Sequence, residues 1–162
     1  MKYTVLVVED EHDQRRALIE NVDWASADFE VIGEAENGVE ALDVLETLEP
    51  DLLLTDIKMP LISGLELAAR VREIRPATQV VILSGYDSFE YAQTAINYNI
   101  ISYLLKPISP DEMSKELTKI HSRMDERFSV VSKAHSIGTK EQLRELSIDN
   151  FLLPLMLGSN EE

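Results

Sequence analysis

The sequence predicts an α/β protein built on a doubly wound, five-stranded parallel sheet with helices on both faces. Five short apolar runs alternate with five segments in which apolar residues recur at helical spacing. The runs are almost continuously apolar, which is typical of strands that are buried on both sides. Parallel strands also need long crossover connections, and the segments between the runs supply them.

Each expected strand is a short run rich in branched aliphatic or aromatic residues. The five runs are Tyr3 to Glu9 (YTVLVVE), Phe29 to Ala35 (FEVIGEA), Asp51 to Thr55 (DLLLT), Gln79 to Ser84 (QVVILS) and Ser102 to Leu105 (SYLL). Sheets of this kind bind ligands at the carboxyl ends of their strands. The residues at the ends of these runs are therefore the first candidates for a functional site.

The expected helices lie between these strands and after the last one. Their apolar residues repeat every three or four positions, as Val39, Leu42, Leu45 and Leu48 do in the second helix. The five segments are Arg15 to Val22, Val39 to Leu48, Leu65 to Ile74, Phe89 to Ile96 and Met113 to Met124. Strand and helix thus alternate through residues 1–125, which we predict to be one domain.

Residues 126–162 do not continue this alternation, and we predict that they form a helical linker. Phe128 to Ser136 is typical of a helix end, Gly138 and Thr139 of a break, and Lys140 to Leu157 of a further helix capped by Thr139. We expect the sheet to lie out of reach beyond Met124.

An apolar stripe runs along the last of these expected helices. It contains Leu143, Leu146, Phe151, Leu152, Leu155 and Met156, with Pro154 kinking or shortening the helix. A stripe left in water promotes aggregation. We therefore expect it to pack on the first domain, on a second copy of the chain or on a further domain.

Charge and composition argue against several classes of partner. The chain has 30 acidic and 15 basic residues, a formal net charge of -15, which disfavours direct binding to nucleic acid or to an anionic membrane. No run approaches the roughly 20 apolar residues of a membrane span, and the first residues do not form a signal peptide, so we expect a cytoplasmic location. The lack of cysteine excludes disulfides and thiolate metal sites.

Charged or polar residues stand at four of the five strand ends. Glu9 and Asp10 close the first run, Asp56 follows the third, Ser84 ends the fourth and Lys106 follows the fifth. Three carboxylates at one edge of a sheet repel one another unless a cation or a proton neutralises them. Oxygen ligands without nearby Cys or His favour Mg²⁺ as that cation.

Each of these residues also has a simpler interpretation. Acids favour the start of a helix, Ser84 is typical of a turn, Lys106 of a solvated surface, and Tyr103 of a half-buried strand. Four separate strand ends that each carry the residue type needed for one site are improbable by chance. We therefore favour a common site.

These residues lie in segments that resemble the receiver domain of two-component response regulators. The segments are VVEDE (Val7 to Glu11), DIKMPLISGLEL (Asp56 to Leu67), LSGYDSFEYA (Leu83 to Ala92) and YLLKPI (Tyr103 to Ile108). The resemblance covers about residues 1–125 and implies a flavodoxin-like fold. It also implies a signalling protein whose partner is a sensor histidine kinase. Such a receiver catalyses only its own phosphorylation and dephosphorylation.

The resemblance assigns a role to each site residue. Asp56 would be the phosphoacceptor, and Lys106 would contact the phosphoryl group. The metal ligands would be Glu9, Asp10, Asp56 and the backbone carbonyl of Lys58, and the conformational switch would be formed by Ser84 and Tyr103. Glu9 departs from the family, because many members carry Asp there, and its longer side chain can reach a metal through water.

A narrower resemblance concerns the output. SGYDSFEYAQTAI followed by YLLKPI is similar to receivers that precede AraC-type helix-turn-helix domains. No recognition helix is recognisable in residues 126–162, so DNA binding is expected only through an output domain outside this sequence. Because AraC-type regulators commonly act in pairs, we favour a homodimer contact through the helical tail.

Two other functions fit part of the pattern. A haloacid-dehalogenase-type phosphohydrolase also uses a strand-end Asp with Mg²⁺, but such enzymes carry a second acid two residues later, where this chain has Lys58, and their metal-binding acids come late in the sequence. A receiver-like protein that only mediates contacts is the second alternative. Every reactive position is filled here, which argues against it.

Overall fold

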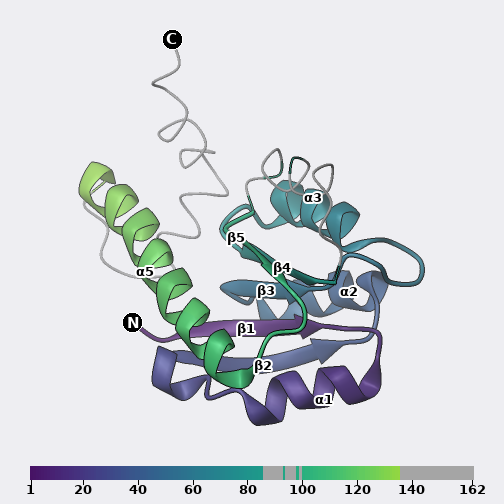
Figure 1. Ribbon diagram of the computed structural model, residues 1–162. Helices are drawn as coiled ribbons and strands as arrows, with labels where there is room; N and C mark the ends of the chain where they lie inside the picture. Colours follow the sequence, from purple (N-terminus) through teal and green to yellow (C-terminus); the bar gives the residue numbers. More distant parts are fainter. Residues whose placement is uncertain (86–92, 94–97, 99, 136–162) are drawn as a thin grey trace.

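The computed structural model describes residues 1–85, 93, 98 and 100–135 (Figure 1). Five strands and four α-helices are defined within these residues, together with one short 3-10 helix. In chain order they are β1 (Tyr3–Val8), α1 (His12–Asn21), η1 (Ala25–Ala27), β2 (Phe29–Ala35), α2 (Gly38–Leu48), β3 (Leu52–Thr55), α3 (Gly64–Ile74), β4 (Gln79–Ser84), β5 (Ser102–Leu105) and α5 (Pro110–His135).

The five strands form one parallel sheet in the order β2-β1-β3-β4-β5. The chain therefore moves outward from β1 to β2, returns to the other side of β1 at β3, and continues outward from there. In sheets of this type, ligands bind where the direction of winding reverses, which here is at the carboxyl ends of β1 and β3. The prediction of a doubly wound, five-stranded parallel sheet is confirmed.

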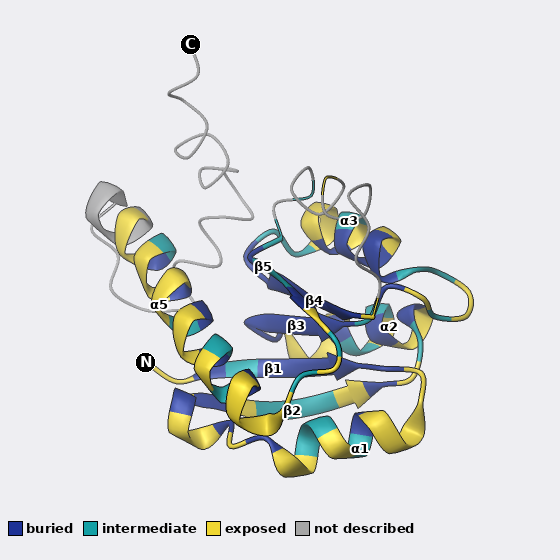
Figure 2. Cartoon of the chain, in the orientation of Figure 1, coloured by how far each residue is buried: buried dark blue, intermediate teal, exposed yellow. Residues whose placement is uncertain are grey.

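Successive residues of the strands face two separate cores, one on each side of the sheet. Tyr3, Val5 and Val7 of β1 pack in the core beneath α5 and the end of α1. Leu6 and Val8 face the opposite core, to which α2 and α3 contribute. Figures 1 and 2 show the same arrangement, with buried strands between helices whose outward faces are exposed. Burial on both faces explains why the strand sequences lack polar alternation.

The predicted strands agree with the structure to within one residue at each end. The helices begin earlier than predicted, by three residues in both α1 and α5, because their first turns are polar and carry no apolar periodicity. A reciprocal pair of hydrogen bonds between Ser109 and Glu112 caps the start of α5, and Pro110 occupies its first position. The helix predicted at Phe89 to Ile96 and the elements predicted within 136–162 lie outside the described residues.

The expectation that the sheet lies out of reach beyond Met124 is wrong. Phe128 is buried in the core, and its ring centroid lies 5.8 Å from that of Tyr3 at the start of β1. Arg127 hydrogen-bonds to Gln79 at the start of β4. The helix runs along the sheet toward the amino ends of the strands, as Figure 1 shows, so its later turns still find strand residues to cover.

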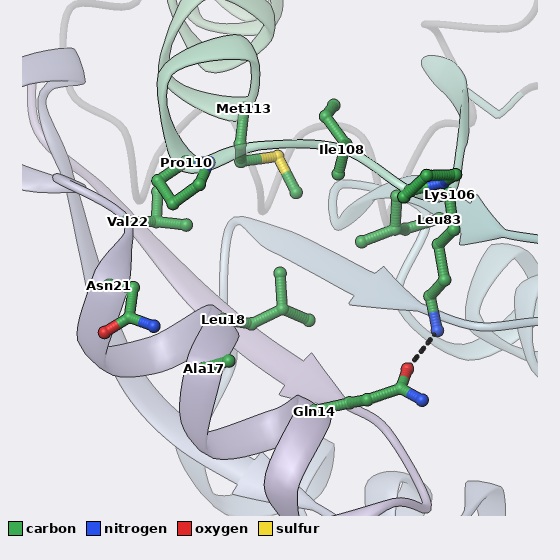
Figure 3. Close-up of a pocket in the computed structure, with 11 residues that line it drawn as sticks. Gln14, Ala17, Leu18, Asn21, Val22, Leu83, Lys106, Ile108, Pro110 and Met113 are labelled. Atoms are coloured by element: carbon green, nitrogen blue, oxygen red, sulfur yellow. Dashed lines mark hydrogen bonds between the residues drawn. The ribbon is translucent and has the colours of Figure 1, made fainter.

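A cavity of about 400 Å³ opens between α1 and the start of α5 (Figure 3). Its wall is mostly apolar and includes Leu18, Ile108 and Met113. Gln14 and Lys106 lie together at one end of it. In the part of the chain that the structure describes, no helix has the length and hydropathy needed to span a membrane.

Candidate functional site

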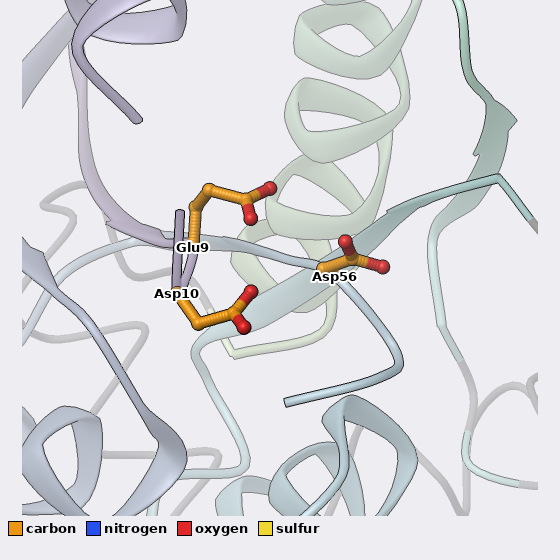
Figure 4. Close-up of side chains that lie close together, drawn as sticks. All are labelled: Glu9, Asp10 and Asp56. Carbon is orange, nitrogen blue, oxygen red and sulfur yellow. The ribbon is translucent and has the colours of Figure 1, made fainter. Parts of the chain in front are cut away.

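The ends of β1 and β3 bring three acidic side chains together. Val8 pairs with Thr55 in the parallel ladder, so the residues that follow them emerge side by side at the same edge of the sheet. Carboxylate oxygens of Glu9, Asp10 and Asp56 lie within 4.8 Å of one another (Figure 4). Sheet topology thus joins acids that are separated by more than forty residues in the sequence.

Short-range contacts hold Asp56 in place. Its Oδ1 accepts a hydrogen bond of 2.6 Å from the backbone N–H of Ile57, and its backbone carbonyl accepts one of 2.9 Å from the Thr55 hydroxyl. The side chain is 13% exposed, so one edge of the carboxylate is open to an incoming group.

Gly64 at the start of α3 packs directly against the Asp56 backbone. Its N–H donates to the carbonyl of Ile57 at 2.7 Å, and a Cβ at this position would lie 1.8 Å from the carbonyl oxygen of Asp56. A side chain larger than hydrogen would therefore push the loop and helix apart. Close packing, not a left-handed backbone, is what requires glycine here.

The Lys106 ammonium group is the cationic centre of the site. It donates to Glu9 Oε1 at 2.9 Å, to Asp56 Oδ2 at 2.9 Å and to Gln14 Oε1 at 2.7 Å. Burial lowers the pKa of Lys106, but its hydrogen bonds to Glu9 and Asp56 outweigh this, so the pKa lies above its ordinary value. The group is therefore held as a cation between two carboxylates.

Glu9 is the most deeply buried of the three acids, with 2% of the residue exposed. Burial raises its pKa above the ordinary value, against the opposing effect of the hydrogen bond from Lys106. Its Oε2 also accepts from the backbone N–H of Glu11 at 3.2 Å. A buried carboxylate with a raised pKa is stabilised in its charged form by an added cation.

The donor set fits Mg²⁺. Three carboxylates from two adjacent strand ends offer oxygen ligands only, and their separation allows one small ion to reach all three. Mg²⁺ usually keeps several waters and binds few protein oxygens, which matches a site open on one side. Glu9, Asp10 and Asp56 are the residues that would hold it.

The other predicted site residues lie at the same edge of the sheet or next to it. Ser84 is buried at the end of β4, and its carbonyl accepts from the Lys106 N–H at 2.8 Å. Tyr103 pairs with Ile82 in the sheet and is half-buried against the core on the α3 side. Lys58 is exposed in the loop after Asp56.

Two residues on α1 belong to the site and were missed by the sequence reasoning. Gln14 contacts Lys106, and the buried Arg15 donates from Nη1 to the carbonyl of Glu9 at 2.7 Å. Arg15 is itself anchored by Glu34 on β2, at 2.8 Å from its Nε. Their position in the sequence could have identified them as site residues. The first turn of a helix that follows a strand end lies beside that end.

This chain is similar to known proteins in sequence and in fold. The family model described as "Response regulator receiver domain" matches residues 5–118. The transcriptional regulatory protein YesN of Bacillus subtilis is 33% identical over 158 residues, which is 96% of this chain and 43% of YesN. The transcriptional regulatory protein HptR of Staphylococcus aureus is 33% identical over 118 residues, 73% of this chain and 46% of HptR. The chain thus spans less than half the length of these relatives.

Two solved structures give the same result. The receiver domain of AraT, a response regulator from Geobacillus stearothermophilus, has a TM-score of 0.71 and 36% identity, over 78% of this chain and 98% of that one. A two-component transcriptional regulator AraC from Clostridium phytofermentans has a TM-score of 0.69 and 33% identity, over 77% of this chain and 97% of that one. The haloacid-dehalogenase alternative is thereby set aside as a family assignment. The chain belongs to the receiver domain family of two-component response regulators.

Proposed function

We propose that Asp56 accepts a phosphoryl group from a phosphohistidine of a sensor kinase. A bond forms between an Asp56 carboxylate oxygen and phosphorus as the P–N bond breaks, and its electron pair returns to the imidazole. The observation that carries this proposal is the Asp56 carboxylate, partly open to solvent and 2.9 Å from the Lys106 ammonium. An oriented carboxylate next to a fixed cation is what phosphoryl transfer requires of a protein.

The remaining residues of the site take roles that follow from their positions. Glu9 and Asp10, with Asp56 and the backbone carbonyl of Lys58, would hold Mg²⁺. Bound there, Mg²⁺ would offset negative charge on the phosphoryl oxygens. Lys106 would donate to one of these oxygens, because it already points at Asp56.

Phosphorylation is proposed to act on the β4 and β5 edge of the site. The Ser84 hydroxyl would donate to the phosphoryl group, and Tyr103 would turn inward as the surrounding surface repacks. A new charge-assisted hydrogen bond can bias an element that has two arrangements. If Ser84→Ala and the wild type gave the same beryllofluoride-induced NMR shifts around Tyr103, this coupling would be wrong.

The phosphoacceptor assignment is tested by labelling with acetyl phosphate, with and without Mg²⁺, followed by intact mass measurement. Wild type should gain one phosphoryl group only with Mg²⁺, and Asp56→Asn should gain none. Asp13→Asn is the matched control, because this side chain is fully exposed on α1 and should label as wild type does. Equal labelling of wild type and Asp56→Asn would contradict the assignment, and a wild type that gains no phosphoryl group would favour a contact-only protein.

We propose further that this receiver controls an AraC-type DNA-binding domain outside these 162 residues, in the cytoplasm. The match to YesN supports this, because it extends over 158 residues and so continues through the tail. The formal charge of -15 opposes direct DNA binding by this chain. Gel retardation of DNA by the chain at physiological salt would contradict that part of the proposal.

The tail beyond α5 is proposed to mediate a homodimer. The apolar stripe predicted in residues 143–156 supports this. Sedimentation of this chain should be compared with a version ending at His135, which keeps all of α5 and the core residue Phe128. Monomers for both, with and without beryllofluoride, would contradict the proposal.

The protein is proposed to catalyse no reaction on other molecules. Its phosphoryl group would leave only by hydrolysis of its own aspartyl phosphate or by return to the kinase. Sustained turnover of p-nitrophenyl phosphate would contradict this and indicate a phosphatase.

A further inference from the structure

Gln14, in the first turn of α1, contacts the proposed catalytic lysine directly. Its Oε1 accepts a hydrogen bond of 2.7 Å from the Lys106 ammonium, at the end of the cavity between α1 and α5 (Figure 3). The two residues are 92 positions apart in the sequence. The contact therefore joins α1 to the segment that follows β5.

The orientation of the Gln14 amide follows from its two neighbours. Its Nε2 donates to Glu11 Oε2 at 3.0 Å, while its Oε1 faces the Lys106 cation. The reversed amide would place N–H groups against the ammonium and a carbonyl against the carboxylate, so both contacts would be lost. The Glu11 side chain makes no capping hydrogen bond to α1, and its Oε2 instead orients Gln14.

Lys106 has three N–H groups, and each has one acceptor in this structure: Glu9, Asp56 and Gln14. Two of these acceptors change during the proposed reaction, because Asp56 becomes phosphorylated and Glu9 is a proposed metal ligand. Gln14 is neutral and does neither. It is the acceptor that can keep its contact with Lys106 throughout.

We propose that Gln14 is a positioning residue that holds the Lys106 ammonium toward Asp56 during phosphoryl transfer. The inference rests on the proposed phosphorylation of Asp56. Gln14 contributes no proton and no ligand; it restricts where the flexible lysine side chain lies. Removing the Gln14 acceptor should therefore slow the labelling of Asp56, and this effect should depend on Lys106 alone.

The test compares initial rates of labelling by acetyl phosphate at saturating Mg²⁺. Gln14→Met keeps the length of the side chain but removes the acceptor, and it should label about fivefold more slowly than wild type, as expected for one lost hydrogen bond. Gln14→Glu keeps an acceptor, and its initial rate of labelling should be at least about twofold higher than that of Gln14→Met. Melting temperatures should be unchanged, since Gln14 is exposed.

A double-mutant cycle separates positioning from a general effect on the helix. In a Lys106→Met background, Gln14→Met should cause no further slowing. Labelling of Gln14→Met at the wild-type rate, or equal slowing in both backgrounds, would overturn the role of Gln14 and leave the phosphoacceptor assignment intact. A wild type that is not labelled at Asp56 would overturn the proposed function and this inference with it.

Discussion

The Nζ atom of Lys106 lies 2.9 Å from Oδ2 of Asp56, although fifty positions separate the two residues in the sequence. The same ammonium bridges to Glu9 at 2.9 Å. Lys106 thus occupies oxygens that Mg²⁺ would also use. Cation and lysine compete for these carboxylates, which leads to the first prediction.

Lys106→Met should bind Mg²⁺ more tightly than wild type, by roughly fivefold, because a positive charge and a competing donor are removed from the carboxylates. The same variant should be labelled more slowly by acetyl phosphate, since it has lost the cation that faces the phosphoryl group. Calorimetric titration with Mg²⁺ gives the affinity. Lys119→Met, an exposed lysine on α5, is the control and should change neither quantity. Weaker Mg²⁺ binding by Lys106→Met would show that the two cations do not compete.

Gly64→Ala should destabilise the protein by about 2 kcal/mol or more, because the new methyl group would overlap the Asp56 carbonyl oxygen. It should also slow labelling of Asp56, whose loop has to shift to make room. Gly85→Ala is the matched control, since a Cβ there meets nothing within 4 Å. Urea unfolding followed by fluorescence of the buried Trp24 gives the free energies of unfolding. Equal stability of the two variants would contradict the close-packing argument.

Phe128→Ala should lower the free energy of unfolding by about 3 kcal/mol, because a buried ring in contact with Tyr3 is removed. Val130→Ala, two residues later on the same helix but 42% exposed, should change it by less than about 0.5 kcal/mol. The same urea experiment measures both. Similar values for the two variants would mean that α5 leaves the core before residue 128.

Tyr3→Phe should lower the free energy of unfolding at pH 7 by about 1 kcal/mol, because the Tyr3 hydroxyl donates to Asp125 Oδ1 at 2.6 Å. Burial, and then the Asp125 carboxylate, raise the pKa of Tyr3 above its ordinary value of about 10. The folded state therefore keeps a proton that the unfolded chain releases.

The stability linked to this proton is complete below about pH 10 and is lost as the pH rises from there toward the folded-state pKa. Wild type should lose stability more steeply than Tyr3→Phe as the pH rises above 10. Urea unfolding of both proteins across this range is the measurement. Parallel curves would show that the hydroxyl is not held in its protonated form.

Much of this site could be predicted from the sequence because it depends on where strands end. Runs of apolar residues predicted the strands, and in a parallel sheet their carboxyl ends share one edge, so Glu9, Asp10, Asp56 and Lys106 had to come close together. The contacts with Gln14 and Arg15 could not be predicted in this way. Both lie in the polar start of α1, where no apolar pattern predicts which side chain turns toward the site.

The sequence by itself determined the elements, their alternation and the residue types at the sheet edge, since these depend on local periodicity and on chain order. Only the tertiary structure decided which residues each of these side chains contacts. How far α5 stays packed on the core depends on the contact between Phe128 and Tyr3, which lies 125 positions earlier in the sequence. The partners of Lys106 depend on the distances between β1, β3 and α1. Contacts of this kind arise from the packing of distant segments, and no local pattern of residues encodes them.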